Sequence, residues 1–99
     1  MQLRERVNEA IGIHSAQRGR RSRLVAVGQH LGTLTPRERE VLERVMDGRQ
    51  NAEIAVDLGI STKTVEQHRA RVMTKMKVDS LAELVVQVTE WRLLSEPLR

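Results

Sequence analysis

The side chains best suited to chemistry lie between Gly59 and Met76, in the stretch GISTKTVEQHRARVMTKM. On a helix, one face of this stretch would carry no large apolar group and would present Lys63, Glu66, Gln67, Ala70, Arg71 and Thr74. Gln67 and Arg71 can hydrogen-bond to base edges, and Glu66 can accept a bond from the amine of cytosine. Ala70 and Thr74 are small enough to let a helix lie close to a groove floor. The pattern predicts noncovalent recognition of a nucleic acid.

Polar residues at the start of the same stretch suit phosphate oxygens. Backbone N–H groups at a helix N-terminus favour anions, and the residues placed there are Ser61, Thr62, Lys63 and Thr64. Five basic residues and two acids give residues 59–79 a net charge of +3, whereas four Arg and six acids give residues 34–58 a net charge of −2. Segregated basic charge indicates a polyanionic partner. The alternative is a solvated basic face that binds nothing.

The composition argues against other kinds of site. The chain has no Cys, which excludes disulfides, thiolate metal sites and cysteine nucleophiles. His14, His30 and His68 are dispersed and show no metal-binding spacing. The segment DLGIS lacks the second glycine and the lysine of a phosphate-binding loop. We therefore predict no catalytic residue, no metal, no cofactor and no enzymatic activity.

Helices are the elements that must position these side chains. The chain has 99 residues, no useful strand pattern and one aromatic residue, Trp91, so the core must consist of aliphatic side chains and Met. Such a core is typical of a small all-α bundle. Thr35 as N-cap, Pro36 at the first helical position and Glu38 as capping-box partner predict a helix over residues 36–47, ended by Gly48.

Three further helices are expected. Asn51 is predicted to cap a short helix that ends at Gly59, and Ser61 to cap a helix that runs to about Lys75. The buried stripe of that helix is predicted to be Val65, Val72 and Met76. Ser80 and Glu83 form a second capping box that opens the last helix. Its core stripe is predicted to be Leu81, Leu84, Val85 and Val88, and its candidate contacts with a partner helix are Ala82, Val86 and Trp91.

The first 33 residues read as a helical segment and a basic linker. Leu3, Val7, Ala10 and Ile11 share one helical face, and HSAQRGRRSR, residues 14–23, is predicted to be a linker. The alternative is a basic arm that contacts phosphates. Leu24, Val27, Leu31 and Leu34 form a narrow seam, which predicts a helical or partly ordered lead-in despite Gly28 and Gly32.

Nothing in the sequence predicts contact with a membrane. The chain has no apolar run of the roughly 18 residues that a span requires, and its N-terminus, MQLRERVNEA, lacks the apolar core of a signal peptide. We therefore expect a cytoplasmic protein.

The link GIS between the two central helices has the spacing of a helix-turn-helix, in which a short helix braces one that enters the major groove. The opening LTPREREVL, the core IAVDLGISTKTVEQH and the later KMKVDSLAEL resemble the LuxR-type helix-turn-helix domain. The resemblance is greatest to the output domains of FixJ- and NarL-like response regulators. It covers about residues 34–88.

The resemblance implies a four-helix domain over residues 34–95 that regulates transcription. The protein would bind double-stranded promoter DNA as a homodimer through its recognition helix, residues 62–76. RNA polymerase is a further candidate partner. It places Glu66, Gln67 and Ala70 where relatives reach bases. Near the DNA backbone it places Thr64, His68 and Lys75 or Lys77. The last helix would supply much of the dimer contact.

The chain departs from the family pattern in two places. Relatives often carry Lys or another long donor at the positions of Glu66 and Ala70, and Lys at the position of Ala52. The operator of a better-known relative therefore does not transfer to this chain.

Residues 1–33 are similar to the end of a FixJ-type receiver, where the last receiver helix (LRERVNEAI here) leads into a linker. This similarity implies that no receiver phosphorylation site lies in these 99 residues. Two other hypotheses stay open. One is a protein-binding module that dimerises through its last helix without touching DNA. The other is a sigma-factor promoter-binding domain, against which the TPRERE opening favours the LuxR type.

Overall fold

The computed structural model describes residues 19–95, and within them the protein has five helices and no strand. The N-terminal helix occupies residues 19–32, and the helices that follow are α2 (Pro36–Met46), α3 (Asn51–Leu58), α4 (Thr62–Met76) and α5 (Leu81–Ser95). The prediction of an all-α fold is confirmed. No helix in residues 19–95 has both the length and the apolar character needed to cross a bilayer.

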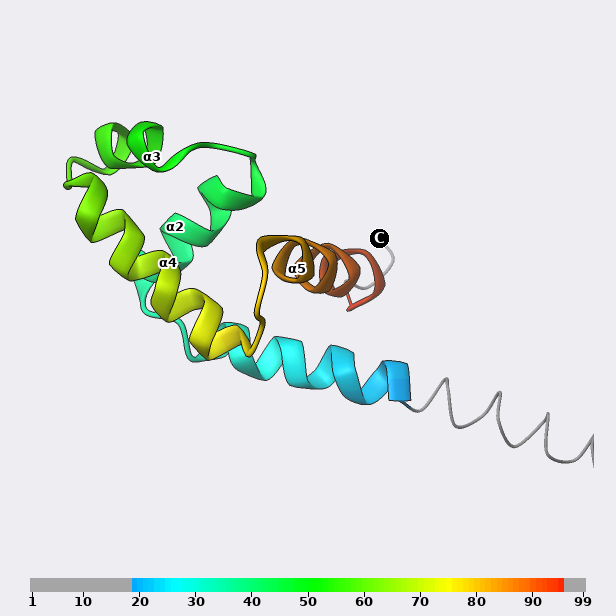
Figure 1. The fold of residues 1–99 in the computed structure, drawn as a ribbon. Helices are drawn as coiled ribbons and strands as arrows, with labels where there is room; N and C mark the ends of the chain where they lie inside the picture. The colour runs from blue at the N-terminus through cyan, green and yellow to red at the C-terminus, as the bar shows by residue number, and fades with distance from the viewer. Residues whose placement is uncertain (1–18, 96–99) are drawn as a thin grey trace, which may run out of the picture.

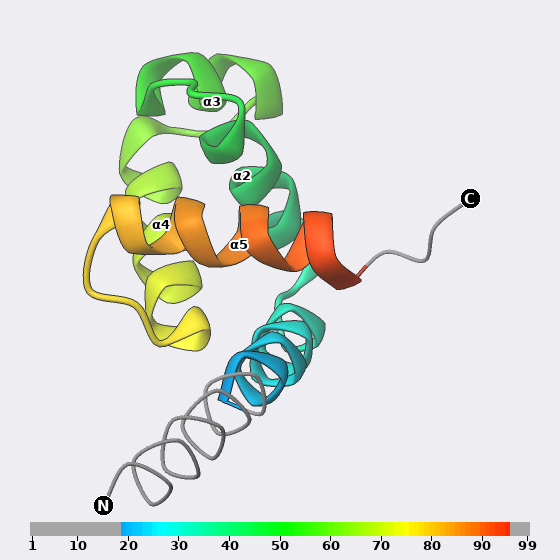
Figure 2. The same ribbon diagram turned by 90° about the vertical axis from the view of Figure 1, so that its right-hand side faces the viewer.

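Helix α4 packs against three other helices, α2, α3 and α5. Figure 1 shows α4 along the left-hand edge of the molecule, with α5 to its right. The N-terminal helix lies by the C-terminal end of α4, and Figure 2 shows α5 in front of α4 with the N-terminal helix below it. Helix α4 therefore keeps one side for packing, while its opposite side faces away from the bundle.

Aliphatic side chains from every helix form the core. Val65, Val72 and Met76 are each at most 2% exposed, as the sequence predicted for the buried stripe of α4. The other buried apolar residues are Val27, Leu34, Val41, Leu42, Val45, Ile54, Ala55, Val78, Leu84 and Val88. Because these side chains bury one side of α4 in the core, the opposite side is the one that a partner could contact.

The start of α2 follows the prediction from its sequence. The Thr35 Oγ1 accepts a hydrogen bond from the Glu38 N–H at 3.2 Å, and the Glu38 carboxylate accepts one from the Thr35 N–H at 2.9 Å. Pro36 is the first helical residue, Asp47 is the C-cap, and Gly48 has a φ of 81°. The capping box is therefore confirmed, and the helix ends one residue before the predicted bound.

The start of α3 differs from the prediction. Gln50 is the N-cap and Asn51 is the first helical residue. The Asn51 Oδ1 instead accepts a hydrogen bond from the Arg69 guanidinium at 2.7 Å, so this side chain bridges to α4. The Glu53 carboxylate accepts a bond from the Gln50 N–H at 3.0 Å. Gly59 ends the helix in the left-handed conformation, as predicted.

The start of α5 agrees with the prediction only in part. The Ser80 Oγ accepts the Glu83 N–H at 3.1 Å, but the Glu83 carboxylate binds the N–H of Asp79, at 3.0 Å, instead of that of Ser80. Leu81 was predicted to belong to the core stripe, yet it is 45% exposed. It is the first residue of α5, whose fully buried residues begin at Leu84.

Residues 19–23, part of the predicted linker, are helical and belong to the N-terminal helix. Leu31 packs on the core and Val27 lies within it, so the helix is anchored along the predicted seam. Gly28 fits this helix because Trp91 lies against it: a Cβ there would be 2.9 Å from the Trp91 Nε1. The predicted helical face of residues 3–11 and residues 14–18 lie outside the described range.

Candidate nucleic-acid interface

The outer face of α4 is exposed to solvent. Glu66, Gln67, Ala70 and Arg71 are all exposed, and opposite them Val65 is fully buried. Among residues 19–95, the side chains of Glu66, Gln67 and Arg71 form no hydrogen bond or ion pair. The predicted base-contacting residues therefore share one accessible face, and their polar groups are available to a partner.

The C-terminal half of this face carries two small side chains, those of Ala70 and Thr74, and is slightly hollowed. A shallow hollow of about 210 Å³ is lined by Ala70, Arg71, Thr74 and Lys75. The Thr74 Oγ1 donates to the Ala70 carbonyl at 3.0 Å, so its hydroxyl hydrogen is already used within the helix. Helix α4 can therefore approach another surface closely at Ala70, with the Arg71 guanidinium beside the hollow.

The N-terminus of α4 presents polar groups in a fixed geometry. Ser61 is the N-cap, and its Oγ accepts the Thr64 N–H at 3.0 Å and lies 2.8 Å from the Thr64 Oγ1. Ser61, Thr62 and Lys63 are exposed, and Thr64 is half-buried. The first N–H groups of a helix have no partner within it, so this end suits an anion.

Lys75, a predicted phosphate contact, is used within the chain. Its ammonium lies 2.7 Å from the Glu38 carboxylate and donates to the Thr33 carbonyl at 3.3 Å. Two of its three N–H groups are thus occupied. Burial raises the pKa of Glu38, but the hydrogen bonds from Lys75 and Thr35 and the charge of Lys75 outweigh it and hold that pKa below 4.5.

The two remaining predicted backbone contacts differ in accessibility. His68 is half-buried, and its Nδ1 is buried with no hydrogen-bond partner within the described part of the chain. Lys77 is exposed and caps α4 in the left-handed conformation, with a φ of 57°. Of these two residues, Lys77 is the one whose charge lies fully at the surface.

Arg69 has a structural role that the sequence did not reveal. Its hydrogen bond to Asn51 joins α4 to the first residue of α3. Arg44 on α2 lies 2.6 Å from Asp57 near the end of α3, and this bond lowers the pKa of Asp57. Polar bonds therefore fix α3 at both ends. The only signal in the sequence is Asn51, a residue type that also favours the N-cap position.

The three predicted dimer contacts on α5 are not equivalent. Ala82 is exposed and Val86 is 60% exposed. Trp91 is half-buried and packs against the core of its own chain, next to Gly28. Of the three, Ala82 and Val86 are exposed and therefore available to a partner.

Comparison with known proteins identifies the family. The model of the bacterial regulatory proteins of the luxR family matches residues 32–88, more than half of the chain. The chain belongs to this family. Members are DNA-binding transcription regulators, and the matched residues 32–88 are a helix-turn-helix domain of this type.

Relatives include response regulators. The chain is 53% identical over 72 residues to the transcriptional regulatory protein FixJ of Azorhizobium caulinodans, covering 72% of this chain and 34% of the relative. It is 43% identical over 83 residues to the tetrathionate response regulatory protein TtrR of Salmonella typhimurium, a match that covers 84% of this chain and 38% of TtrR. Full-length FixJ from B. japonicum has a similar structure, with a TM-score of 0.70 and 33% sequence identity. That match covers 94% of this chain and 46% of the FixJ chain. The chain thus spans about a third of the length of these curated relatives.

Proposed function

We propose that this chain is a sequence-specific transcription regulator that binds double-stranded promoter DNA as a homodimer, with α4 in the major groove. The observation that carries the proposal is the exposed face of Glu66, Gln67, Ala70 and Arg71, whose polar side chains have no partner within residues 19–95. Gln and Arg side chains can hydrogen-bond to base edges in the major groove, and Glu can accept a bond from the amine of cytosine.

Phosphate contacts would fix the helix in the groove. In this proposal Ser61, Thr62, Lys63 and Thr64 bind one stretch of backbone at the N-terminus of α4. Lys77, with a smaller share from the third N–H of Lys75, binds backbone near its C-terminal end, and His68 contributes from the middle of the helix. The two groups lie at the two ends of a 15-residue helix, so they would hold it along the groove.

A dimer would place two α4 helices in successive major grooves, about 34–36 Å apart. Ala82 and Val86 on α5 are the proposed dimer contacts, together with the half-buried Trp91. As a regulator the protein would act on transcription by RNA polymerase, through DNA binding rather than enzymatic activity. A receiver phosphorylation site is no part of this proposal.

The first test is the salt dependence of binding. Replacement of both Lys63 and Arg71 by Ala should weaken binding to an operator selected from random DNA, and should flatten the plot of log affinity against log salt by up to about two units. A matched control replaces Arg20 and Arg21, which line a surface hollow beside Trp91 and Leu94 at the end of α5. This control should change affinity little, which also tests the basic-arm hypothesis.

The second test separates sequence recognition from charge. Gln67→Ala should relax the preference for one base pair by about 1–3 kcal/mol and leave the salt slope unchanged. Gln29→Ala, at an exposed position of the N-terminal helix, is the matched control. Unchanged operator affinity and base preference in Gln67→Ala and in the double variant would refute the assignment of α4. A protein-only module would show no salt-sensitive binding at all.

A further inference from the structure

Thr74 lies on the outer face of α4, one turn beyond the residues proposed to contact bases. Seven residues separate it from Gln67, which is close to two turns of an α-helix, so the two side chains lie in line on the same face. Thr74 is exposed, as are Ala70 and Arg71. It therefore belongs to the surface that faces DNA in the proposed function.

The hydroxyl group of Thr74 is already engaged within the helix. Its Oγ1 donates a hydrogen bond to the Ala70 carbonyl at 3.0 Å. That bond uses the hydroxyl hydrogen and holds the side chain in one rotamer. The Thr74 methyl group is therefore held in a fixed position. Residues four apart are neighbours on a helix surface, so this methyl group and that of Ala70 form one small apolar area.

The hollow of about 210 Å³ on this face includes that apolar area, and it is lined by Ala70, Arg71, Thr74 and Lys75. Its two longer side chains differ in freedom. Lys75 is held by the Glu38 carboxylate and the Thr33 carbonyl, so its stem is a fixed wall. Arg71 forms no hydrogen bond or ion pair within the described residues, so its guanidinium can turn toward a partner.

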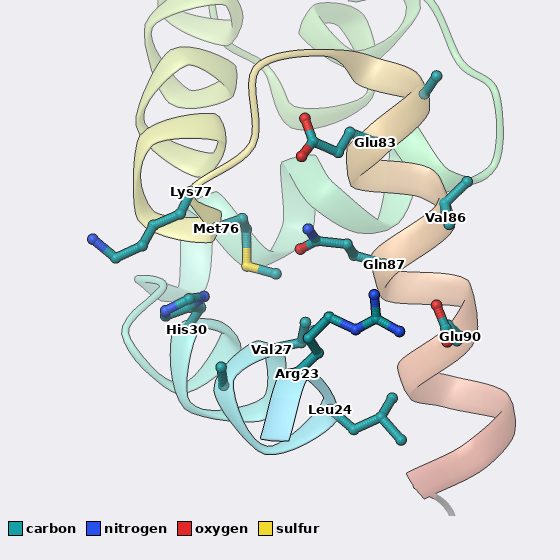
Figure 3. Close-up of a pocket in the computed structure, with 12 residues that line it drawn as sticks. Arg23, Leu24, Val27, His30, Met76, Lys77, Glu83, Val86, Gln87 and Glu90 are labelled. Carbon is teal, nitrogen blue, oxygen red and sulfur yellow. The ribbon is translucent and has the colours of Figure 1, made fainter. Parts of the chain in front are cut away.

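Phosphate contacts at both ends of α4 would set the hollow over the base edges. Figure 3 shows the Lys77 side chain extending away from the groove between the N-terminal helix and α5, whereas the neighbouring Met76 points into that groove. The Lys77 ammonium is thus directed to solvent just beyond Thr74. With residues 61–64 bound to backbone at the other end, α4 would lie along the major groove with Thr74 over its floor.

We propose that Thr74 is a specificity-determining residue, whose methyl group and adjoining hollow receive the 5-methyl group of a thymine. Thymine is the one unmodified base that presents a methyl group in the major groove, and the methyl groups of Ala and Thr make apolar contact with it. This inference rests on the proposed function, in which α4 lies in the major groove. It deepens that function by naming a base that the polar residues of the face do not select.

Arg71 predicts where this thymine lies in the operator. It precedes Thr74 by three residues, which is about 4.5 Å along the helix axis, and successive base pairs are about 3.4 Å apart. An Arg guanidinium binds the O6 and N7 atoms of a guanine. The thymine should therefore lie within about two base pairs of the guanine that Arg71 contacts, and Arg71→Ala, by relaxing the preference at that guanine, identifies it.

The test removes the methyl group separately from the DNA and from the protein. The probe is an operator selected from random DNA by the full chain, in which each thymine in turn is replaced by deoxyuridine, a base that lacks only the 5-methyl group. At one thymine of a half-site the replacement should weaken binding about fourfold, the factor that one buried methyl group is worth. Thr74→Ser keeps the hydroxyl and deletes the methyl group, so it should bind the thymine and deoxyuridine operators equally.

Two further variants complete the test. Thr74→Val keeps a methyl group and deletes the hydroxyl, so its preference for thymine over deoxyuridine should persist. Thr33→Ser is the matched control, because Thr33 also donates its hydroxyl to a backbone carbonyl, that of His30, at 2.6 Å. Thr33 precedes α2 and lies outside the proposed interface, so the control should change neither affinity nor preference. Circular dichroism checks that each variant keeps its helicity.

The contrary outcomes refute different steps. If no deoxyuridine replacement weakens binding, no thymine methyl group is read. If the preference persists in Thr74→Ser but disappears in Thr74→Val, the hydroxyl contacts the DNA and the methyl group does not. If the preference persists in both variants, or the thymine lies far from the Arg71 guanine, another residue reads it. In these cases the operator is still bound and the proposed function stands. If selection yields no operator, the proposed function fails and this inference fails with it.

Discussion

The Lys75 ammonium lies 2.7 Å from the Glu38 carboxylate and so joins the last turn of α4 to the first turn of α2. Glu38 is 2% exposed, and the same carboxylate accepts the Thr35 N–H that caps α2. Lys75 also donates to the Thr33 carbonyl, just after the N-terminal helix. Three segments therefore meet at one ion pair, and the placement of α4 depends on charge as well as on apolar packing.

Loss of Lys75 should destabilise the fold more than its partly exposed position suggests. Lys75→Met leaves the Glu38 carboxylate buried without its counter-ion, and we expect a loss of about 2–3 kcal/mol in the free energy of unfolding. Glu38→Gln removes the buried charge itself and should cost less, about 1 kcal/mol. Urea unfolding measures both. Arg37→Ala, which breaks an exposed pair with Glu40, is the control and should cost no more than about 0.5 kcal/mol. Equal costs for all three variants would contradict the role of the pair.

The same pair predicts a pH dependence of stability. The pKa of Glu38 lies below 4.5 in the folded chain because the hydrogen bonds and charge outweigh the effect of burial. A lowered folded-state pKa contributes stability above the unfolded value, and that contribution is lost as pH falls through the folded value. The free-energy difference between the original chain and Glu38→Gln should thus stay constant down to about pH 4.5 and shrink below it. The pKa of Asp57 is also lowered, but Asp57 is present in both proteins, so its contribution to the pH dependence cancels in the difference. A difference that grows on acidification would reverse the assigned sign.

Two glycines of the N-terminal helix should respond oppositely to replacement by Ala. At Gly32 a Cβ would meet nothing within 4 Å, so Gly32→Ala should stabilise the helix by about 0.5–1 kcal/mol. At Gly28 a Cβ would lie 2.9 Å from the Trp91 Nε1, so Gly28→Ala must displace the indole and should lower stability despite the better helix propensity. Thermal unfolding and Trp91 fluorescence report on the two effects. A stabilising Gly28→Ala with unchanged fluorescence would mean that Trp91 does not pack there.

Local patterns predicted most of the fold. The stripe of Val65, Val72 and Met76, the Thr35–Glu38 capping box and the Gly59 terminus all follow from spacing and caps within one element, and all are confirmed. The exposed face of α4 followed from the same spacing. These features depend on residues that are close in sequence, so the sequence contains the information that specifies them.

The sequence was least informative where two elements meet. Asn51 could be interpreted as a cap because nothing in its own segment shows that Arg69, on another helix, binds its side chain. The ion pair between Lys75 and Glu38 could not be predicted from either segment, because the two residues lie 37 positions apart along the chain. Residues 19–23 were predicted to be a linker from composition alone, although the helix that contains them is anchored through Val27 and Leu31. In each case the position or conformation of the residue depends on a contact between helices, which the local spacing of residues does not encode.

Lys77 offers a test that separates stability from DNA binding at one residue. It holds a φ of 57° and a ψ of 47° at the end of α4, a conformation that costs a residue with a Cβ roughly 1–2 kcal/mol. Lys77→Gly removes this strain but adds freedom to the unfolded chain, so we expect a net gain of about 0.5–1 kcal/mol in unfolding free energy. If Lys77 binds phosphate, the same variant should bind the operator more weakly, with a salt slope smaller by about one unit. Lys77→Ala is the control, because it loses the same charge without relieving the strain: its DNA affinity should fall equally and its stability should not rise. Operator affinity unchanged in both variants would remove Lys77 from the proposed interface, whereas a lower stability of Lys77→Gly would show that the lysine stem makes contacts that outweigh the strain.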